Sequence, residues 1–401
     1  MDLPSAPFRI LWGSPLPPTR SGVADYAAEL LPELVRLVPV RVLAPDGWRP
    51  PPGWPAAVEP VAMNEPAAPG EVVLLHLGNN PYHLPFLDRL VSDAGAVVVL
   101  HDAVLHHLLV ESTVARGETE AYETELTASH GARGRALAVA RGVGLVGHLD
   151  PFLFPARGSL LARASAVVVH SRWAAEAVRS DLPDLPVGRV ALPVADPGPV
   201  DGNEVRSRLG LDPGDVIAMH LGFLTPEKGL MEVLAGVGAA VAAGVEARLV
   251  LVGEGAAGDA IRRAVAGGVL EGRVDTTGWV EPELFPSIPA AADLGFARRT
   301  PSAGETSAAV LRFLACGVPV AVSGVRQFLE WPEAAAPRVT PGPSASADVA
   351  RLLGAVRSDG WAERRRAARA VYQRHHVPRV AARQLVEVLE ELVGRAARVR
   401  P

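Results

Sequence analysis

Short runs rich in Val, Ile and Leu alternate with helical stretches along the whole 401-residue chain. Most of these apolar runs are continuous, which is typical of strands that are covered on both faces of a sheet. Strands that alternate with helices in this way form parallel sheets with right-handed crossovers. We therefore predict an α/β fold, with strands at 8–11, 40–43, 72–77, 96–100, 166–170 and 189–192 in the first half and at 216–221, 248–252, 273–276, 294–297, 318–322 and 338–340 in the second.

The length of the chain and one stretch rich in Pro, Gly and Asp predict two domains. A chain of 401 residues exceeds what one ordinary core holds, which is about 250–300 residues. The stretch Pro193–Asn203 separates two strand–helix series. We predict domains at 1–195 and 204–374, followed by a C-terminal segment, 375–401, with the apolar spacing of an amphipathic helix.

Composition excludes several classes of protein. The net charge is −5 and there is no basic run, so no nucleic-acid partner is expected. The single cysteine, Cys316, excludes an internal disulfide and a cysteine metal cluster, and it favours a reducing, cytoplasmic setting. Neither a signal peptide nor a transmembrane helix is expected, because Met1–Trp12 lacks the signal pattern and no apolar run reaches about 18 residues.

The chain contains 38 arginines but one lysine, Lys228, which lies just after a predicted strand. Thr225 suits the N-cap and Pro226 the first position of a helix, so Lys228 is expected in its first turn. A cation at the positive end of a helix is disfavoured unless an anion joins it. A diphosphate held by Lys228 and free backbone amides, with Gly222 beside it, would supply that anion. The alternative is a solvated lysine paired with Glu227.

A second candidate site precedes the predicted helix that ends at Gly317. Gly304 would let a ligand approach the backbone closely. Glu305 could accept hydrogen bonds from sugar hydroxyls, and Thr306 and Ser307 offer hydroxyls and first-turn amides. The pair Arg298-Arg299 suits phosphate.

The same segment has a purely structural alternative. Ser302 and Glu305 have the spacing of a capping box, in which the two side chains satisfy the first amides of a helix.

A third group of candidates follows the strands of the first half. Ser14–Tyr26 is a long loop in which Ser21 or Gly22 opens a helix. Polar residues at strand ends line the ligand-binding edge of such sheets. We therefore expect His101 at the site, or alternatively bonded to a backbone carbonyl. The further candidates on this side are Arg20, Asn79, Asn80 and Asp102.

Taken in order, these segments resemble the retaining glycosyltransferases of the GT-B fold, family 4, also called group 1. The resemblance covers nearly the whole chain and is carried by PLPPTRSGVADYAAEL, HLGNNPYH, VVVLHD, VVVHSRW, GFLTPEKG, LVLVGEG and GETSAAVLRFLACGVPVAV. It implies two Rossmann-like domains facing a central cleft, with a C-terminal helix that crosses back onto the first domain.

The resemblance also implies an activity and roles for residues. A sugar would pass from a nucleotide-diphosphate donor to an acceptor with retention of configuration, and neither a metal nor another cofactor is expected. Lys228 would hold the diphosphate, with Gly22 near the same phosphates. Glu305, His101 and the amides of Thr306 and Ser307 would contact the sugar or the phosphates. The acceptor could be a glycan, a lipid-linked glycan or a small molecule, and a membrane-bound acceptor would be reached by peripheral association.

Two departures from the family pattern leave alternatives open. Phe223 stands where the family usually has an arginine, and Arg312 where it usually has a second glutamate. We hypothesise that Arg299 replaces the missing cation. The departures also motivate a non-catalytic GT-B scaffold or nucleotide-sugar-binding subunit, and a nucleotide-sugar epimerase is a third interpretation.

Overall fold

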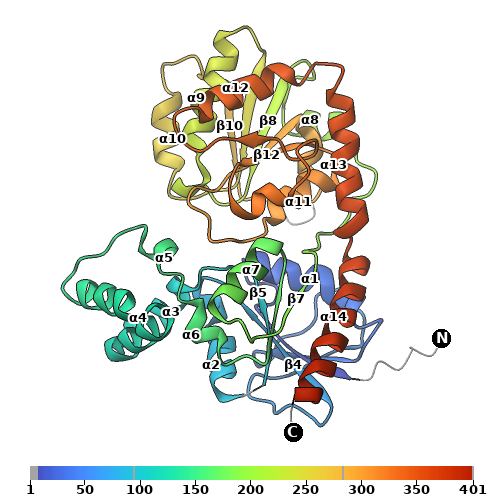
Figure 1. Ribbon diagram of the computed structural model, residues 1–401. Helices are drawn as coiled ribbons and strands as arrows, with labels where there is room; N and C mark the ends of the chain where they lie inside the picture. The colour runs from blue at the N-terminus through green and yellow to red at the C-terminus, as the bar shows by residue number, and fades with distance from the viewer. Residues whose placement is uncertain (1–7, 94, 282–283, 400–401) are drawn as a thin grey trace. The chain divides into compact units, whose positions relative to one another are not determined.

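The computed structural model describes residues 8–93, 95–281 and 284–399, and these form two compact units (Figure 1). The first unit comprises what is described of Met1–Pro193 and Pro378–Pro401, together with the short segment Ala303–Thr306. The second unit comprises Val194–Ser302 and Ser307–Val377. Each unit is built around its own parallel sheet, as predicted for an α/β chain.

The first unit contains a seven-stranded parallel sheet in the order β3-β2-β1-β4-β5-β6-β7. The order reverses between β1 and β4, which places the ligand-binding point of such sheets at the carboxyl ends of these two strands. The strands are β1 (Arg9–Gly13), β2 (Val40–Ala44), β3 (Val58–Ala62), β4 (Glu71–Leu77), β5 (Val97–Leu100), β6 (Ala166–Val169) and β7 (Val187–Arg189).

The second unit contains a six-stranded parallel sheet in the order β10-β9-β8-β11-β12-β13. This is the strand order of a classic dinucleotide-binding Rossmann sheet, with its reversal between β8 and β11. The strands are β8 (Val216–Leu221), β9 (Ala247–Val252), β10 (Val274–Gly278), β11 (Leu294–Ala297), β12 (Val320–Ser323) and β13 (Arg338–Val339).

Two strands differ from the sequence-based expectation. The structure adds β3, which was not predicted because its sequence, VEPVA, is mostly exposed and contains Pro60. Proline is tolerated there because β3 is the edge strand of the sheet. The strand expected at 189–192 lies earlier, as β7, although the amide of Val190 still donates to the carbonyl of Val169 in β6 at 3.0 Å.

Helices cover both sheets. The first unit has α1 (Gly22–Leu34), α2 (Leu84–Ser92), α3 (His106–Ser112), α4 (Thr119–Gly142), α5 (Asp150–Leu153), α6 (Arg157–Leu161), α7 (Arg172–Asp181) and α14 (Pro378–Val399). The second has α8 (Gly202–Arg208), α9 (Leu230–Ala242), α10 (Gly258–Val265), α11 (Ala308–Ala315), α12 (Ala345–Ala355) and α13 (Trp361–His375).

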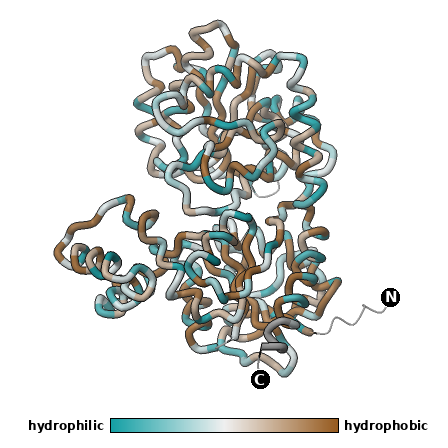
Figure 2. Tube along the Cα trace, in the orientation of Figure 1, coloured by the Kyte–Doolittle hydropathy of each residue, from teal (hydrophilic) through white to brown (hydrophobic). Residues whose placement is uncertain are grey.

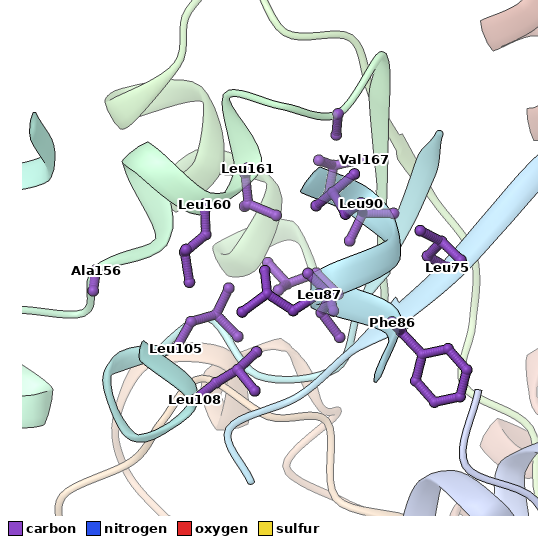
Figure 3. Close-up of a cluster of buried hydrophobic side chains, with 14 of the residues drawn as sticks. Leu75, Phe86, Leu87, Leu90, Leu105, Leu108, Ala156, Leu160, Leu161 and Val167 are labelled. Atoms are coloured by element: carbon purple, nitrogen blue, oxygen red, sulfur yellow. The ribbon is translucent and has the colours of Figure 1, made fainter. Parts of the chain in front are cut away.

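Each sheet buries its apolar side chains against these helices, and Figure 2 gives the hydropathy of each residue along the trace. In the first unit the cluster joins strand residues such as Leu75 and Val167 to Phe86 of α2 and Leu161 of α6 (Figure 3). The continuous apolar strands are thus covered on both faces, which is why they do not show polar alternation.

The C-terminal helix α14 packs within the first unit. It contacts α1 and β7, and Gln384 accepts a hydrogen bond from the amide of Ala191 at 3.2 Å. A Cβ built on Gly188 of β7 would lie 2.3 Å from Cγ1 of Val388, so a glycine is needed for the helix to approach this closely. Among the described residues, no helix is long and apolar enough to cross a membrane.

Candidate functional site

The turn that carries Lys228 differs from the predicted helix start. Pro226–Lys228 forms a single 3-10 turn with Thr225 before it, and the side chain of Thr225 makes no capping hydrogen bond. Gly229 then takes a left-handed conformation, with φ 61°, and α9 begins only at Leu230. Lys228 lies in this single 3-10 turn, with Thr225 at the N-cap and Pro226 at the first position as predicted, but the turn is separate from the start of α9.

The side chain of Lys228 is buried at the end of β8, with 8% of the residue exposed. A Cβ built on Gly222 would lie 3.1 Å from Nζ of Lys228, so the amine rests against the backbone of the residue that follows the strand. This burial contradicts the alternative of a solvated surface lysine. Gly222 and Lys228 are thus brought together, as predicted.

Two consecutive arginines at the end of β11 lie differently. Arg298 is 2% exposed, and its Nη1 donates to the carbonyl of Gly229 at 3.0 Å and lies 3.7 Å from a carboxylate oxygen of Glu232. Arg298 therefore stabilises the turn that carries Lys228. Its guanidinium contacts protein groups, whereas the sequence predicted that it binds phosphate. Arg299 is held through its backbone, whose amide donates to Oγ of Ser323 at 3.0 Å.

A buried histidine reports the charge of this region. His220 lies in β8, and its Nδ1 is 3.1 Å from the carbonyl oxygen of Phe296 in β11. Burial, and then the positive charge of Lys228 and, less strongly, of Arg299, lower the pKa of His220 to about 3. Lys228 follows β8 and Arg299 follows β11, the two strands at the reversal of the second sheet, which is where such sheets bind ligands.

His220 was not among the residues singled out from the sequence. It stands inside an apolar strand, and its relation to Lys228 and Arg299 depends on the pairing of β8 with β11.

The start of α11 corrects the second candidate site. The N-cap is Ser307, whose Oγ accepts from the amide of Val310, so the free amides of the first turn begin at Ala308 rather than at Thr306. Ser302 is buried, and its Oγ accepts from Nε2 of Gln327 at 2.7 Å. The capping-box alternative for Ser302 and Glu305 is therefore wrong.

Gly304 packs tightly against protein atoms of the first unit. It has φ +80°, and an added Cβ would lie 2.3 Å from Cζ3 of Trp173 and 2.8 Å from Cβ of Ala103. The amide of Val104 donates to the carbonyl of Ala303 at 3.0 Å. Gly304 thus permits a close approach, as predicted, but the atoms that approach it in this structure belong to the chain itself. Glu305 and Thr306 follow in the same segment.

His101 follows β5 and lies at the centre of an aromatic cluster in the first unit. Its Nε2 is 2.9 Å from Nδ1 of His76, and its ring centroid lies 4.9 Å from that of Tyr26 and 5.1 Å from that of His170. Burial, and then the neighbouring histidines, hold the pKa of His101 well below its usual value. His101 is therefore neutral near pH 7 and offers a hydrogen-bonding imidazole without charge.

Two other histidines of this cluster, His83 and His170, bond to backbone carbonyls, which was the alternative considered for His101. Nδ1 of His83 donates a hydrogen bond to the carbonyl oxygen of His76 at 2.8 Å, and Nδ1 of His170 donates one to the carbonyl oxygen of Val190 at 3.0 Å. Burial lowers the pKa of each to about 4. His76, His101 and His170 stand at the ends of the adjacent strands β4, β5 and β6, a positional signal that would have identified His170 from the sequence.

Three polar candidates near His101 hold the surrounding loops in place. Oδ1 of Asn79 accepts from the amide of His107 at the start of α3, at 2.8 Å, and Oδ1 of Asn80 accepts from the amide of Tyr82 at 3.1 Å. Oδ2 of Asp102 accepts from the amide of Asn79 at 2.7 Å. These contacts bring Asn79 and Asp102 together.

The remaining candidates of the first unit flank the start of α1. Ser21 is the N-cap, with its side chain accepting from the amide of Val23, as predicted. A Cβ built on Gly22 would meet no atom within 4 Å, so the first turn of α1 is open at this point. Arg20 is exposed in the preceding loop.

The two departures from the family pattern have distinct surroundings. Phe223 is 53% exposed directly after Gly222. Arg312 is buried in α11, with its guanidinium 5.0 Å from the ring centroid of Phe285. Among the described residues, no three His, Cys, Asp or Glu side chains are placed to hold a metal ion.

Solved structures with the same fold define the class. HepE from Anabaena in complex with UDP is 16% identical, with a TM-score of 0.60, over 96% of this chain and 100% of that one. Sucrose-phosphate synthase from Thermosynechococcus elongatus is 17% identical, with a TM-score of 0.61, over 97% and 100%. WaaG, a glycosyltransferase involved in lipopolysaccharide biosynthesis, is 13% identical, with a TM-score of 0.58, over 94% and 99%. The fold is that of the GT-B glycosyltransferases, as predicted.

The match to a protein family lies in the second unit. Residues 215–353 match the model of the family described as glycosyl transferases group 1. The matched region contains the turn of Lys228, the two arginines after β11 and the start of α11. No curated protein matches the sequence significantly.

Proposed function

We propose that this chain is a retaining glycosyltransferase that binds the diphosphate of a nucleotide-sugar beside Lys228 and transfers the sugar without a metal ion. The observation that carries the proposal is the buried amine of Lys228, which lies against Gly222 at the reversal of the β8–β11 sheet. Arg299 follows β11, the strand that pairs with β8, and its positive charge, like that of Lys228, lowers the pKa of His220. Both cations lie in the part of the chain that matches group 1.

The chemistry requires stabilisation of a leaving group. Breaking the bond between the sugar and the diphosphate develops positive charge on the sugar and negative charge on the leaving oxygen. Fixed cations aimed at that oxygen lower the barrier because they need no rearrangement during the reaction. Lys228 and Arg299 would act in this way, and the leaving phosphate would accept the proton of a hydroxyl acceptor that attacks from the same face.

Roles for the other candidates follow from the same proposal. His101, neutral and fixed by His76, would bond to a hydroxyl of the transferred sugar, and Glu305 would accept hydrogen bonds from others. Gly22, in the open first turn of α1, would lie near the phosphates. Gly304 and the amides of Thr306 and Ser307 would lie near them too. Asn79, Asn80, Asp102 and Arg20 would border the acceptor, which we propose to be met in the cytoplasm.

A second candidate function is a nucleotide-sugar-binding subunit without turnover. It is favoured by exposed Phe223 and buried Arg312, which replace two ligands of the family pattern.

One experiment distinguishes the two functions. Thermal-shift measurements with UDP, GDP, TDP and ADP sugars should identify the donor, because a ligand specific to the folded state raises its stability. UDP and UDP-glucose are the first probes, since HepE was solved in complex with each. The identified donor is then assayed for transfer over a panel of acceptors. Donor binding with no transfer and no hydrolysis would support the binding subunit, and conversion of the donor without an acceptor would indicate an epimerase.

A further inference from the structure

The connection between β2 and β3 carries two tryptophans on matching turns. The chain repeats the pattern Pro-x-Gly-Trp there, as PDGW at 45–48 and PPGW at 51–54. In each turn the amide of the tryptophan donates to the carbonyl of the first proline, at 3.0 Å for Trp48 and 3.2 Å for Trp54. The glycine before the tryptophan has a positive φ, 77° in the first turn and 88° in the second, as a type II turn requires at its third position. Both tryptophans are therefore held at the end of a closed turn.

The two indoles form one half-buried pair, here called the tryptophan pair. Their ring centroids lie 6.1 Å apart at an interplanar angle of 69°, which is an edge-to-face arrangement. Both residues are half-buried, and Nε1 of Trp48 donates to the carbonyl of Pro17 at 2.7 Å. Pro17 lies in the loop between β1 and α1, so this bond joins two loops and fixes the ring of Trp48. The pair is therefore a fixed aromatic surface.

The tryptophan pair stands at the ligand-binding edge of the first sheet. The two loops that it joins follow β1 and β2, so both lie at the carboxyl ends of parallel strands, where such sheets bind ligands. His101 follows β5, which is separated from β2 by β1 and β4. Three strand spacings amount to about 14 Å. The pair is thus a separate position on the same edge, across the strand reversal from His101.

The segment that carries the pair, residues 45–57, is stiff and has no net charge. Five of its thirteen residues are prolines, and its only charged side chains are Asp46 and Arg49. Prolines fix φ and so lower the entropy that is lost when a ligand binds. A nucleic acid would need basic residues beside the aromatic rings on which its bases stack. A neutral sugar needs none, because its C–H face stacks on an indole and its hydroxyls bond to polar groups around the ring.

We infer that the tryptophan pair is a subsite for a neutral oligosaccharide, one sugar ring of which stacks on an indole. The inference rests on the proposed function in one respect, namely that this oligosaccharide is the acceptor. The loop that bonds to Trp48 also carries exposed Arg20, which the proposed function places beside the acceptor. A molecule that reaches from the pair to the strand ends near His101 has to contain several sugars. The acceptor class is therefore an oligosaccharide chain and not a small metabolite.

Glycan binding in the absence of a donor tests this subsite. The wild-type protein is applied to an array of defined neutral glycans, among them malto-, cello-, manno- and N-acetylchito-oligosaccharides with their monosaccharides. Calorimetry then measures the strongest oligosaccharide. Trp54→Ala should lower its affinity by roughly tenfold or more, as for the loss of an aromatic anchor, and Trp54→Phe, which keeps a ring, should lower it less. The matched control is Trp331→Ala, which removes another half-buried indole, 5.3 Å from the ring of His376 in the second unit, and should keep the affinity.

The outcomes separate a sugar subsite from its rivals. Absence of wild-type binding to every oligosaccharide, or an equal loss in Trp54→Ala and Trp331→Ala, would overturn the inference. Binding of a proline-rich peptide and of no glycan would assign the pair to a protein partner instead. Ligand-observed NMR needs no variant, so it remains decisive if Trp54→Ala does not fold. Irradiation of the aromatic protons of the wild type should transfer saturation to the C–H protons of one sugar, and absence of that transfer would exclude stacking.

The same measurements distinguish failure of the inference from failure of the proposed function. If the oligosaccharide binds through Trp54 but no donor is bound or transferred, the proposed function is lost and the subsite stands. If transfer is observed but Trp54→Ala binds glycans as the wild type does, the subsite is lost and the proposed function stands.

Discussion

Lys228 and Arg299 are the two cations whose charge reaches the buried imidazole of His220. Neither residue lies in the first turn of an α-helix. Lys228 lies in a short turn that ends at Gly229, whose carbonyl bonds to Arg298, and Arg299 follows β11. The positions of these side chains therefore depend on the turn and on the end of β11. This makes the donor site testable one side chain at a time.

Replacement of Lys228 by methionine removes the charge and keeps the length of the side chain. We expect Lys228→Met to lower kcat/KM for transfer by roughly 10²–10³-fold, as for other single groups that stabilise an oxyanion. Arg263→Ala, at an exposed position of α10, is the control and should leave the rate unchanged. Wild-type turnover by Lys228→Met would exclude the lysine from the diphosphate site.

Arg299 allows a separate test of the hypothesis that it replaces the arginine that the family usually has where this chain has Phe223. If Arg299 replaces the usual arginine, Arg299→Ala should weaken donor binding by about tenfold or more, as expected for the loss of a charge-assisted contact. Calorimetry with the donor measures this. The control is Arg351→Ala, on the exposed face of α12. Arg326→Ala would be unsuitable, because Nη1 of Arg326 donates to the carbonyl of Ser302 next to the site. Full affinity in Arg299→Ala would contradict the compensation.

The buried histidines of the first unit make its stability depend on pH. The folded pKa of His83 and of His170 is lowered from 6.5 to about 4. Between these values the unfolded state binds more protons, so the stabilisation is complete above pH 6.5 and is lost as the pH falls towards about 4. We expect a loss of a few kcal/mol over this window.

Chemical denaturation at a series of pH values measures this dependence. His170→Asn should reduce the slope of unfolding free energy against pH, while His148→Asn, at an exposed position, should not. A slope that is the same in the wild type and in His170→Asn would show that His170 does not titrate on unfolding.

At the scale of elements, the apolar runs predicted most strands because strands covered on both faces have few alternatives. The errors came from contacts that no local pattern contains. Ser302 fits a capping box by spacing, but its hydroxyl bonds to Gln327, 25 residues away. Gly229 ends the lysine turn with a left-handed backbone, and α9 starts after it; Arg298, 69 residues away, bonds to the carbonyl of Gly229. His220 was missed because it lies within a strand, whereas His170 was missed although it directly follows β6.

The junction of α14 with β7 depends on the absence of a side chain at Gly188. An alanine there would place its Cβ 2.3 Å from Cγ1 of Val388, so Gly188→Ala should destabilise the first unit by about 1–3 kcal/mol through overpacking. Adding Val388→Ala should recover part of the loss, because the methyl group that clashes is removed. Urea unfolding of the two single variants and the double variant measures this coupling. Additive effects would show that the contact is not made.

At the scale of the whole molecule, each unit has its own sheet and its own apolar core. The proposed donor cations Lys228 and Arg299 lie in the second unit. Calorimetric unfolding should therefore depart from a single two-state transition, and the donor should raise the transition of the second unit more than that of the first. Lys228→Met should abolish the shift. A single transition in which the donor moves all signals equally would contradict this prediction.

The chain order of the two units also limits how they can be exchanged with those of other proteins. The first unit is assembled from Met1–Pro193, Ala303–Thr306 and Pro378–Pro401, so a single cut at the linker would leave α1 and β7 without the helix that packs on them. A chimaera that replaces everything after the linker with the second half of another protein would place that protein's terminal helix on the surface at Gly188, which fits Val388 of α14. Engineering at this level needs paired junctions, at Pro193–Val194 and at Val377–Pro378, so that the terminal helix stays with its original host.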